Sequence, residues 1–238
     1  MVEGISRSAQ EEARKLLADC TLFRGLSADQ RKILVARARV RAFSTGDVIF
    51  LMGSPGDSMM AVLNGNVRIS TASSEGKEIV LAIMHPGDVF GEIALLDGKG
   101  RTADAKAMTA CNLAILERRD VLSFFEHHPG AWLGLVQVLC QRLRFSTEQL
   151  TEVALLDLPM RLAKTLLRMA PVGLDGQPAR SAPKIHLSQR ELGNIVGATR
   201  ESVNKCLREW QHSGMIKIED NLITIKNRPA LETLAELD

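Results

Sequence analysis

The sequence predicts an α+β fold in three successive parts: a β-roll, one long helix, and a small C-terminal domain of helices with a hairpin. Between residues 40 and 116, short β-rich runs alternate with glycines, as in a roll or barrel of strands. After Pro129 the apolar residues change from a two-residue to a helical period. Beyond residue 157, helix-capping residues and a turn between two β-rich runs indicate helices followed by a hairpin.

The composition limits the possible functions. The chain has 238 residues, enough for two modest cores, and a formal net charge of +2. This small charge argues against a generally polycationic nucleic-acid binder, so any basic surface must be local. We find neither an apolar run that could span a bilayer nor a signal peptide, and we expect a cytoplasmic protein without a membrane partner. The cysteines are widely spaced without a CxxC pair, which predicts small buried side chains rather than metal ligands: Cys20, Cys111, Cys140 and Cys206.

The first part is expected to span residues 20–128 and to form the β-roll. Its strands include residues 48–50, 67–69 and 79–81, and glycines separate such runs at positions 46, 53, 56, 65, 76, 87 and 91. A cupin-type metal enzyme shares this architecture but needs several histidines on facing strands. Among residues 40–116, which hold the predicted strands, only His85 is a histidine, so we exclude that enzyme and expect no metal site.

Within the roll, Glu92 and Arg101 place a carboxylate and a guanidinium a short loop apart. An arginine fork can hold a phosphate, and a glutamate can accept the hydrogen of a ribose hydroxyl. Residues 92–95 could form the start of a short helix, whose backbone N–H groups would point at the anion. The alternative is a surface ion pair. The flanking residues are apolar, so both charges should be partly buried. Burying a charge costs free energy unless a partner compensates it. This favours a small ligand that carries a phosphate and a sugar.

The second part, residues 129–156, is expected to be one long helix that forms a parallel homodimer. A narrow apolar stripe with alternating steps of four and three residues is typical of a coiled-coil seam: Trp132, Val136, Leu139, Leu143, Ser146, Leu150 and Val153. The alternative is a long helix that packs on its own domain. The hydroxyl of Ser146 would either fix the register or be a tolerated small residue.

The third part, residues 157–228, is expected to be a winged helix-turn-helix domain. We predict a hinge at residues 156–159, a helix over 160–169, a capping box from Ser188 to Glu191, and a second helix capped by Thr199. Gly193 lies where the two helices would touch, and Gly197 lies at the turn. Residues 215–218 and 222–225 form the hairpin. From residue 184 to 208 there are five cations and two anions, which favours DNA binding over mere helix packing.

These motifs together carry a resemblance to a known family. The block of residues 87–96 with residues 101–103 resembles the phosphate-binding cassette of cyclic-nucleotide-binding domains, specifically that of the Crp/Fnr superfamily of transcription regulators. The similarity runs from about residue 22 to about residue 227. The segment between Glu92 and Arg101 is one residue shorter than in the cyclic-AMP-binding members. The iron–sulfur cysteine cluster of the oxygen-sensing branch is missing, which argues against oxygen sensing.

The resemblance implies roles for residues of the ligand site. Glu92 would hold the ribose hydroxyl, while Arg101 and Thr102 would hold the cyclic phosphate. Arg142 would pair with Glu92, and Ser146 and Thr147 would contact the adenine base, one from each subunit. The whole implied ligand site is Gly91, Glu92, Ile93, Ala94, Arg101, Thr102, Ala103, Arg142, Ser146 and Thr147.

The resemblance also implies roles in DNA binding. Arg200 and Glu201 match base-reading positions, and Lys205 stands where the family has an arginine, which makes bidentate readout there an open question. The family's phosphate contacts fall on Ser188, Gln189, Thr199 and Ser202.

The resulting hypothesis is a cytoplasmic homodimeric transcription regulator with no enzyme activity and no catalytic residue. Its allosteric ligand would be 3′,5′-cyclic AMP. Cyclic GMP stays open because a hydroxyl such as that of Thr102 also favours guanine in some related domains. A regulator of the same fold that responds to another effector, or to none, is the alternative. The expected partners are a palindromic operator with TGTGA-like half-sites and RNA polymerase.

Overall fold

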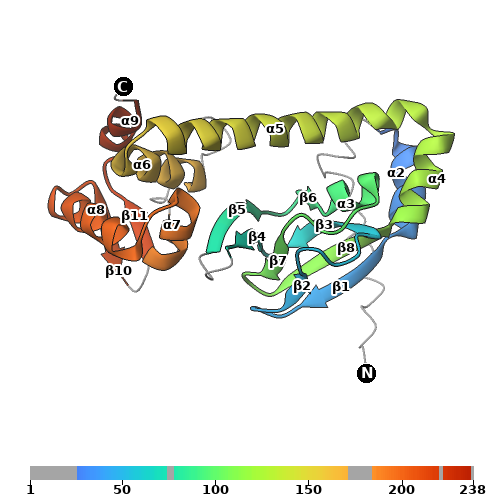
Figure 1. The fold of residues 1–238 in the computed structure, drawn as a ribbon, viewed down its shortest axis with the longest axis horizontal. Helices are drawn as coiled ribbons and strands as arrows, with labels where there is room; N and C mark the ends of the chain where they lie inside the picture. Colours follow the sequence, from blue (N-terminus) through green and yellow to red (C-terminus); the bar gives the residue numbers. More distant parts are fainter. Residues whose placement is uncertain (1–25, 74–77, 171–183, 220–221, 237–238) are drawn as a thin grey trace. The chain divides into compact units, whose positions relative to one another are not determined.

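The computed structural model describes residues 26–73, 78–170, 184–219 and 222–236, and it divides into two compact units, residues 1–144 and 145–238 (Figure 1). Cys20, Gly76 and the predicted start of the first part lie outside the described residues. The turn at residues 220–221, between the two predicted strands of the hairpin, lies outside them as well.

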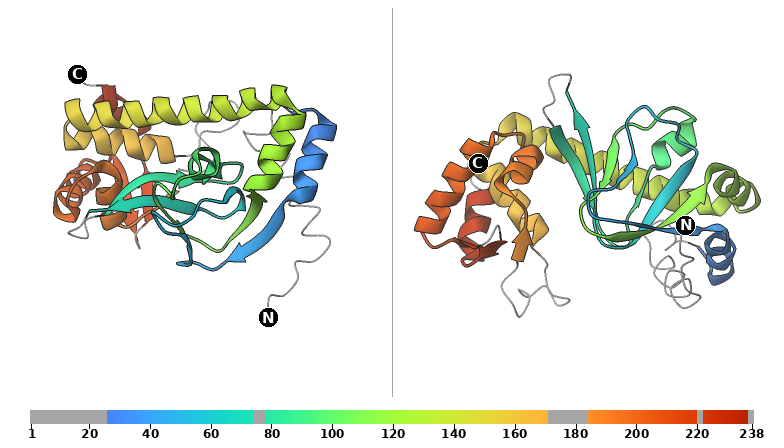
Figure 2. Two further views of the ribbon diagram at one scale, coloured as in Figure 1. Left: turned by 45° about the vertical axis from the view of Figure 1, so that its right-hand side comes forward. Right: turned by 90° about the horizontal axis from the view of Figure 1, so that it is seen from below.

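The first unit is built on two four-stranded antiparallel sheets, in the orders β1-β8-β3-β6 and β2-β7-β4-β5. Figure 2 shows the two sheets facing one another, as the predicted β-roll requires. Side chains from both sheets form one apolar core, which includes Val62, Phe90 and Leu113. The strands are β1 (Arg39–Phe43), β2 (Val48–Phe50), β3 (Ser58–Asn64), β4 (Val67–Ala72), β5 (Glu78–Met84), β6 (Val89–Phe90), β7 (Asp104–Ala107) and β8 (Cys111–Glu117).

Helices α2 (Ala28–Arg37) and α4 (Arg118–His127) complete this unit, and neither was predicted from the sequence. A second apolar cluster joins them to the sheet through residues such as Leu34, Leu116 and Phe124. A short 3-10 turn (Pro129–Ala131) then leads into α5 (Trp132–Leu155). The Trp132 ring stacks on Phe125 of α4 with 4.4 Å between ring centroids, which fixes the start of α5.

Helix α5 confirms the predicted long helix, and two of its faces differ in burial. Leu135 and Val138 are buried against the first unit, so this end of the helix does pack on its own domain. The predicted seam is a different face: Leu143 and Leu150 are 69% and 71% exposed. Within the described part of the chain, the apolar stripe is therefore largely open to solvent.

The second unit contains the predicted helix-turn-helix and hairpin with three differences. Its elements are α6 (Leu158–Met169), β9 (Lys184–His186), α7 (Gln189–Val196), α8 (Arg200–His212), β10 (Ile216–Glu219), β11 (Leu222–Ile225) and α9 (Arg228–Glu236). Helix α6 begins two residues earlier than predicted, because Asp157 Oδ1 accepts a hydrogen bond from Met160 N at 3.0 Å and Pro159 is tolerated in a first turn. Strand β9, which joins the hairpin as a third strand, and helix α9, which contacts α6, were both missed.

Among the described residues, no helix combines the length and apolarity that a membrane crossing needs, and no group of His, Cys, Asp and Glu could hold a metal ion. Cys111 and Cys206 are buried as predicted. The prediction was wrong for Cys140, which is exposed because nothing in the described chain covers that side of α5.

Candidate functional site

The candidate ligand site begins where strand β6 turns directly into helix α3 (Glu92–Asp97). Gly91 makes this turn with φ at 80°, in the left-handed region that favours glycine. A Cβ atom at this position would lie 2.6 Å from Nη1 of Arg101. The backbone conformation therefore favours glycine, and a side chain here would displace the guanidinium of Arg101.

Arg101 is only 4% exposed, although it carries a charge. Its Nη1 donates to Gly91 O at 2.8 Å, its Nη2 donates to Ser58 Oγ at 3.1 Å, and its buried Nε has no partner. No ion pair involves Arg101 within the described residues. Burial lowers the pKa of Arg101, and the charges of Asp57 and Glu92 oppose that shift. The cation is thus desolvated without a carboxylate at contact distance.

Glu92 is fully buried and forms half of an ion pair. Its Oε1 accepts a hydrogen bond from Arg142 Nη1 of helix α5 at 2.6 Å. Its Oε2 is buried and has no hydrogen-bond partner. Burial raises the pKa of Glu92, and the Arg142 guanidinium opposes that shift. The site therefore contains one guanidinium, that of Arg101, without an ion-pair partner among the described residues, together with one unused buried acceptor.

The other residues of the implied ligand site have less specific surroundings. Ala94 and Ala103 are buried, and Ala94 packs so closely on Gly56 that a Cβ atom there would lie 2.2 Å from the Ala94 Cβ. Ile93 and Thr102 are exposed. Ser146 and Thr147 are exposed on α5 and belong to the second unit, so their contact with a base stays a prediction.

Two residues that surround Arg101 were not identified from the sequence. Ser58 opens strand β3 and carries no motif, and Phe50 ends strand β2 and is indistinguishable from a core aromatic residue by pattern alone. The Arg101 guanidinium lies over the Phe50 ring, 4.3 Å from its centroid. Only their position beside Arg101 distinguishes them.

In the second unit, helices α7 and α8 form the predicted helix-turn-helix. Ser188 and Glu191 form a reciprocal capping box, and Thr199 Oγ1 accepts from Ser202 N at 3.2 Å. Gly197 ends α7 with φ at 67°, and a Cβ atom on Gly193 would lie 2.7 Å from the Ala198 carbonyl oxygen. These contacts confirm the predicted capping box, second-helix cap and close helix approach.

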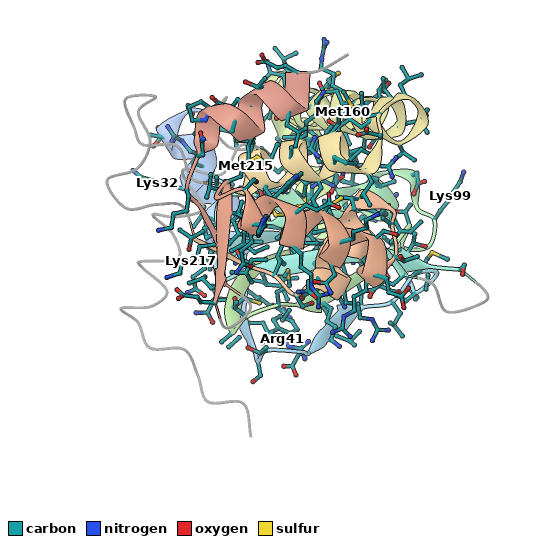
Figure 3. The ribbon with its side chains drawn as sticks, turned by 90° about the vertical axis from the view of Figure 1, so that its left-hand side faces the viewer. Lys32, Arg41, Lys99, Met160, Met215 and Lys217 are labelled. Atoms are coloured by element: carbon teal, nitrogen blue, oxygen red, sulfur yellow. The ribbon has the colours of Figure 1, made fainter. Side chains whose placement is uncertain are left out.

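The start of α8 presents polar side chains to solvent. Thr199, Arg200, Glu201 and Asn204 line a hollow in the surface, and Ser202 and Lys205 are exposed beside it. The hairpin β10–β11 forms the wing, from which Lys217 projects outward (Figure 3). Ser188 and Gln189, at the start of α7, are half-buried. An exposed helix N-terminal half with mixed donors and acceptors suits readout of base edges in a major groove.

Comparison with known proteins agrees with the family resemblance predicted for both halves of the chain. Residues 40–128 match the cyclic nucleotide-binding domain, and residues 160–234 match the Crp-like helix-turn-helix domain. The chain is 31% identical over 218 residues to a CRP-like cAMP-activated global transcriptional regulator of Mycobacterium tuberculosis, covering 91% of this chain and 97% of that protein.

Two solved structures illustrate the similarity of the fold. One is a transcriptional regulator of the CRP/FNR family from Thermus thermophilus, at 29% identity with a TM-score of 0.69, covering 84% of this chain and 99% of the other. The second is the global regulator CLP of Xanthomonas campestris, at 22% identity with a TM-score of 0.74 and the same shares of 84% and 99%.

Proposed function

The chain belongs to the Crp/Fnr family of transcription regulators, and on this premise we propose that it is a homodimer that binds operator DNA when 3′,5′-cyclic AMP occupies its β-roll. Its family domains are a cyclic-nucleotide-binding domain and a DNA-binding domain, and the family is one of regulators rather than enzymes. Cyclic AMP is the effector in the name of the mycobacterial relative, which supports this choice of nucleotide.

The observation that carries the proposal is the incomplete polar site around Arg101. A cyclic nucleotide has one phosphodiester charge and one ribose 2′-hydroxyl. The phosphate would accept from the N–H groups of Arg101 that the protein leaves unused, and the hydroxyl would donate to the unpartnered Oε2 of Glu92. One ligand would therefore provide a partner for both the unused donors of Arg101 and the unused acceptor of Glu92.

Arg142 offers a route from the ligand to the dimer helix. It donates to Glu92 Oε1 and to the Val89 carbonyl oxygen, so α5 is fastened to both the cassette helix and strand β6. A ligand that forms a hydrogen bond with the same carboxylate would change the strength of the contact between Glu92 and Arg142 of α5. It would thereby alter the position of the seam residues on that helix. Cyclic GMP is the second candidate effector, favoured by the exposed hydroxyl residue Thr102 at the phosphate end of the site.

The test is the effect of each nucleotide on operator affinity, measured by fluorescence anisotropy with an operator selected from random DNA. We expect cyclic AMP to tighten binding by about 5- to 150-fold, the usual range of allosteric coupling, and cyclic GMP to do less. Equal operator affinity with and without every nucleotide would support the ligand-independent regulator instead. A larger effect of cyclic GMP would reassign the effector.

Arg200→Ala tests the assignment of α8 as the reading helix. Arg200 is exposed at the first position of α8, where arginine can read guanine through two hydrogen bonds. The variant should lose about 1–3 kcal/mol of discrimination at one base pair of each TGTGA-like half-site. Selection of binding sites by the variant measures this change. Arg208→Ala, an exposed cation further along the same helix, is the matched control and should leave the preferred sequence unchanged.

We extend the proposal to the setting in which such a regulator works. It would act in the cytoplasm, on palindromic DNA, and together with RNA polymerase. The mycobacterial relative is a global transcriptional regulator by name, which supports this setting. Co-purification of RNA polymerase on immobilised operator DNA, only when this protein and its ligand are present, would test the last partner.

A further inference from the structure

The side chain of Phe50 lies in the candidate phosphate site, against one flat face of the Arg101 guanidinium. Arg101 Cζ lies 4.3 Å from the Phe50 ring centroid. The ring also contacts Phe90, with 5.9 Å between centroids, and Phe90 is 1% exposed next to Gly91. The pairing of β2 with β7 shifts register between Val48 and Phe50, an irregularity of the kind that redirects a side chain. The strand and its aromatic neighbour therefore hold the ring in place.

The Phe50 ring helps to explain how the buried Arg101 cation is tolerated without a carboxylate at contact distance. An aromatic face carries partial negative charge and attracts a guanidinium placed over it. Within the described residues, Arg101 forms no ion pair, so this face and two neutral hydrogen-bond acceptors are its direct contacts, while the charges of Asp57 and Glu92 act on it from a longer distance. A carboxylate in the place of the ring would neutralise Arg101 and compete with the phosphate for it. A ring stabilises the charge and leaves it unneutralised.

The stacking also leaves hydrogen-bond donors of the guanidinium without a protein partner. A guanidinium has five N–H donors in its plane, and Arg101 uses two of them, one to Gly91 O and one to Ser58 Oγ. The ring covers a flat face, where no N–H bond points. The buried Nε stays without a partner. The remaining in-plane donors include Nε–H, from which a bidentate contact to phosphate is normally made.

We propose that Phe50 is a positioning residue for anion binding: its ring holds the Arg101 guanidinium in the plane that presents its free edge to the phosphate of the ligand. The proposal rests on the proposed function, because the anion it concerns is the cyclic phosphate. It goes beyond that function by assigning ligand affinity to an apolar side chain outside the cassette.

A series of fluorinated phenylalanines at position 50 tests the proposal directly. Successive fluorines weaken the negative face of the ring while its size and apolar character hardly change. We expect the dissociation constant for cyclic AMP, from calorimetry, to rise stepwise with fluorination and to be about 5- to 30-fold higher in Phe50→Leu, the range of a desolvated cation–π contact. Phe50→Tyr, which keeps the ring face, should retain nearly the affinity of the unchanged protein.

The matched control is Phe43→Leu. Phe43 belongs to the same apolar cluster and lies under the guanidinium of Arg41 at 4.7 Å, away from the site. The Phe43→Leu variant should have a lower melting temperature and an unchanged affinity for cyclic AMP. Equal affinity across the fluorinated series, or a loss no greater than that in Phe43→Leu, would overturn the role of Phe50.

The proposed function and the role of Phe50 fail in different ways. If the unchanged protein binds no cyclic nucleotide, the proposed function is wrong and the role of Phe50 in holding a cyclic phosphate falls with it. If the unchanged protein binds and the series is flat, only the role of Phe50 is wrong. The Nε–H proton of Arg101 gives a spectroscopic check, because the ring should shift its NMR signal upfield and Phe50→Leu should remove that shift. An unshifted signal in the unchanged protein would contradict the stacked geometry.

Discussion

Arg101→Ala is expected to weaken cyclic-AMP binding by at least about 100-fold, or about 3 kcal/mol, measured by isothermal titration calorimetry. Hydrogen bonds to charged groups contribute about 1.5–3 kcal/mol each, and a fork to phosphate supplies two. Arg101 is 4% exposed, so in the native protein bulk water competes little with the phosphate for its donors. Arg101→Lys keeps a point charge without the fork and should fall between the two.

The same variant should stay folded, which separates loss of binding from loss of structure. Burial lowers the pKa of Arg101, so the folded chain disfavours the cation when no anion is bound. Removing the charge relieves that cost and offsets part of the lost packing. We therefore expect the melting temperature without ligand to change little, while the stabilisation by cyclic AMP disappears. At 100 times the dissociation constant, that stabilisation is about 2.7 kcal/mol in the unchanged protein.

The control for this experiment is Arg37→Ala, an arginine whose long ion pair with Asp120 lies outside the cassette. It should bind cyclic AMP as the unchanged protein does. Retained binding in Arg101→Ala would contradict the assignment of Arg101 as the phosphate contact. Equal losses in both variants would point to a general loss of folding.

Features that depend on neighbours in sequence could be predicted well. The capping box at Ser188, the cap at Thr199 and the left-handed Gly197 follow from side-chain chemistry within three or four residues, and each is present. The carboxylate and guanidinium of the cassette are separated by helix α3 and a short loop, and both are buried as their apolar flanks indicated. The long helix followed from its apolar period.

Features that depend on distant partners could not be predicted from the residues themselves. The ion pair of Glu92 with Arg142 joins residues 50 positions apart, and only the family resemblance indicated it. The stacking of Arg101 on Phe50 depends on which strand borders β7. Strand β9 is three residues long, too short to show a period, and α9 packs against α6, which is distant in sequence.

From the sequence, a seam for a second copy and a face packed on its own domain are alternatives; in the structure α5 has a buried face and, apart from it, an exposed apolar stripe. Leu135 and Val138 pack in the core of the first unit, while Leu143 and Leu150 are largely exposed. One helix can carry two apolar faces when the residues of one face alternate in sequence with those of the other. The buried face holds the helix to the roll, and the exposed stripe is left for a partner, which the proposal takes to be a second copy.

Leu143→Glu combined with Leu150→Glu should convert the protein from a dimer to a monomer in analytical ultracentrifugation. In a parallel coiled coil both positions meet their own copy across the seam, so four carboxylates would be forced together in an apolar interface. Both side chains are largely exposed in the single chain, so its fold and circular dichroism should be unchanged. Operator affinity should fall by about 1,000-fold or more, because a monomer can hold only one half-site.

Leu155→Glu is the matched control, because it makes the same change on the same helix at a side chain that is 77% exposed and outside the seam. It should remain a dimer and bind the operator normally. A dimeric double variant would refute the seam as the interface. A monomer that still bound a full operator with undiminished affinity would instead refute the need for two copies on DNA. The joint loss of dimer and operator binding in the double variant alone is the result that the exposed stripe of α5 predicts.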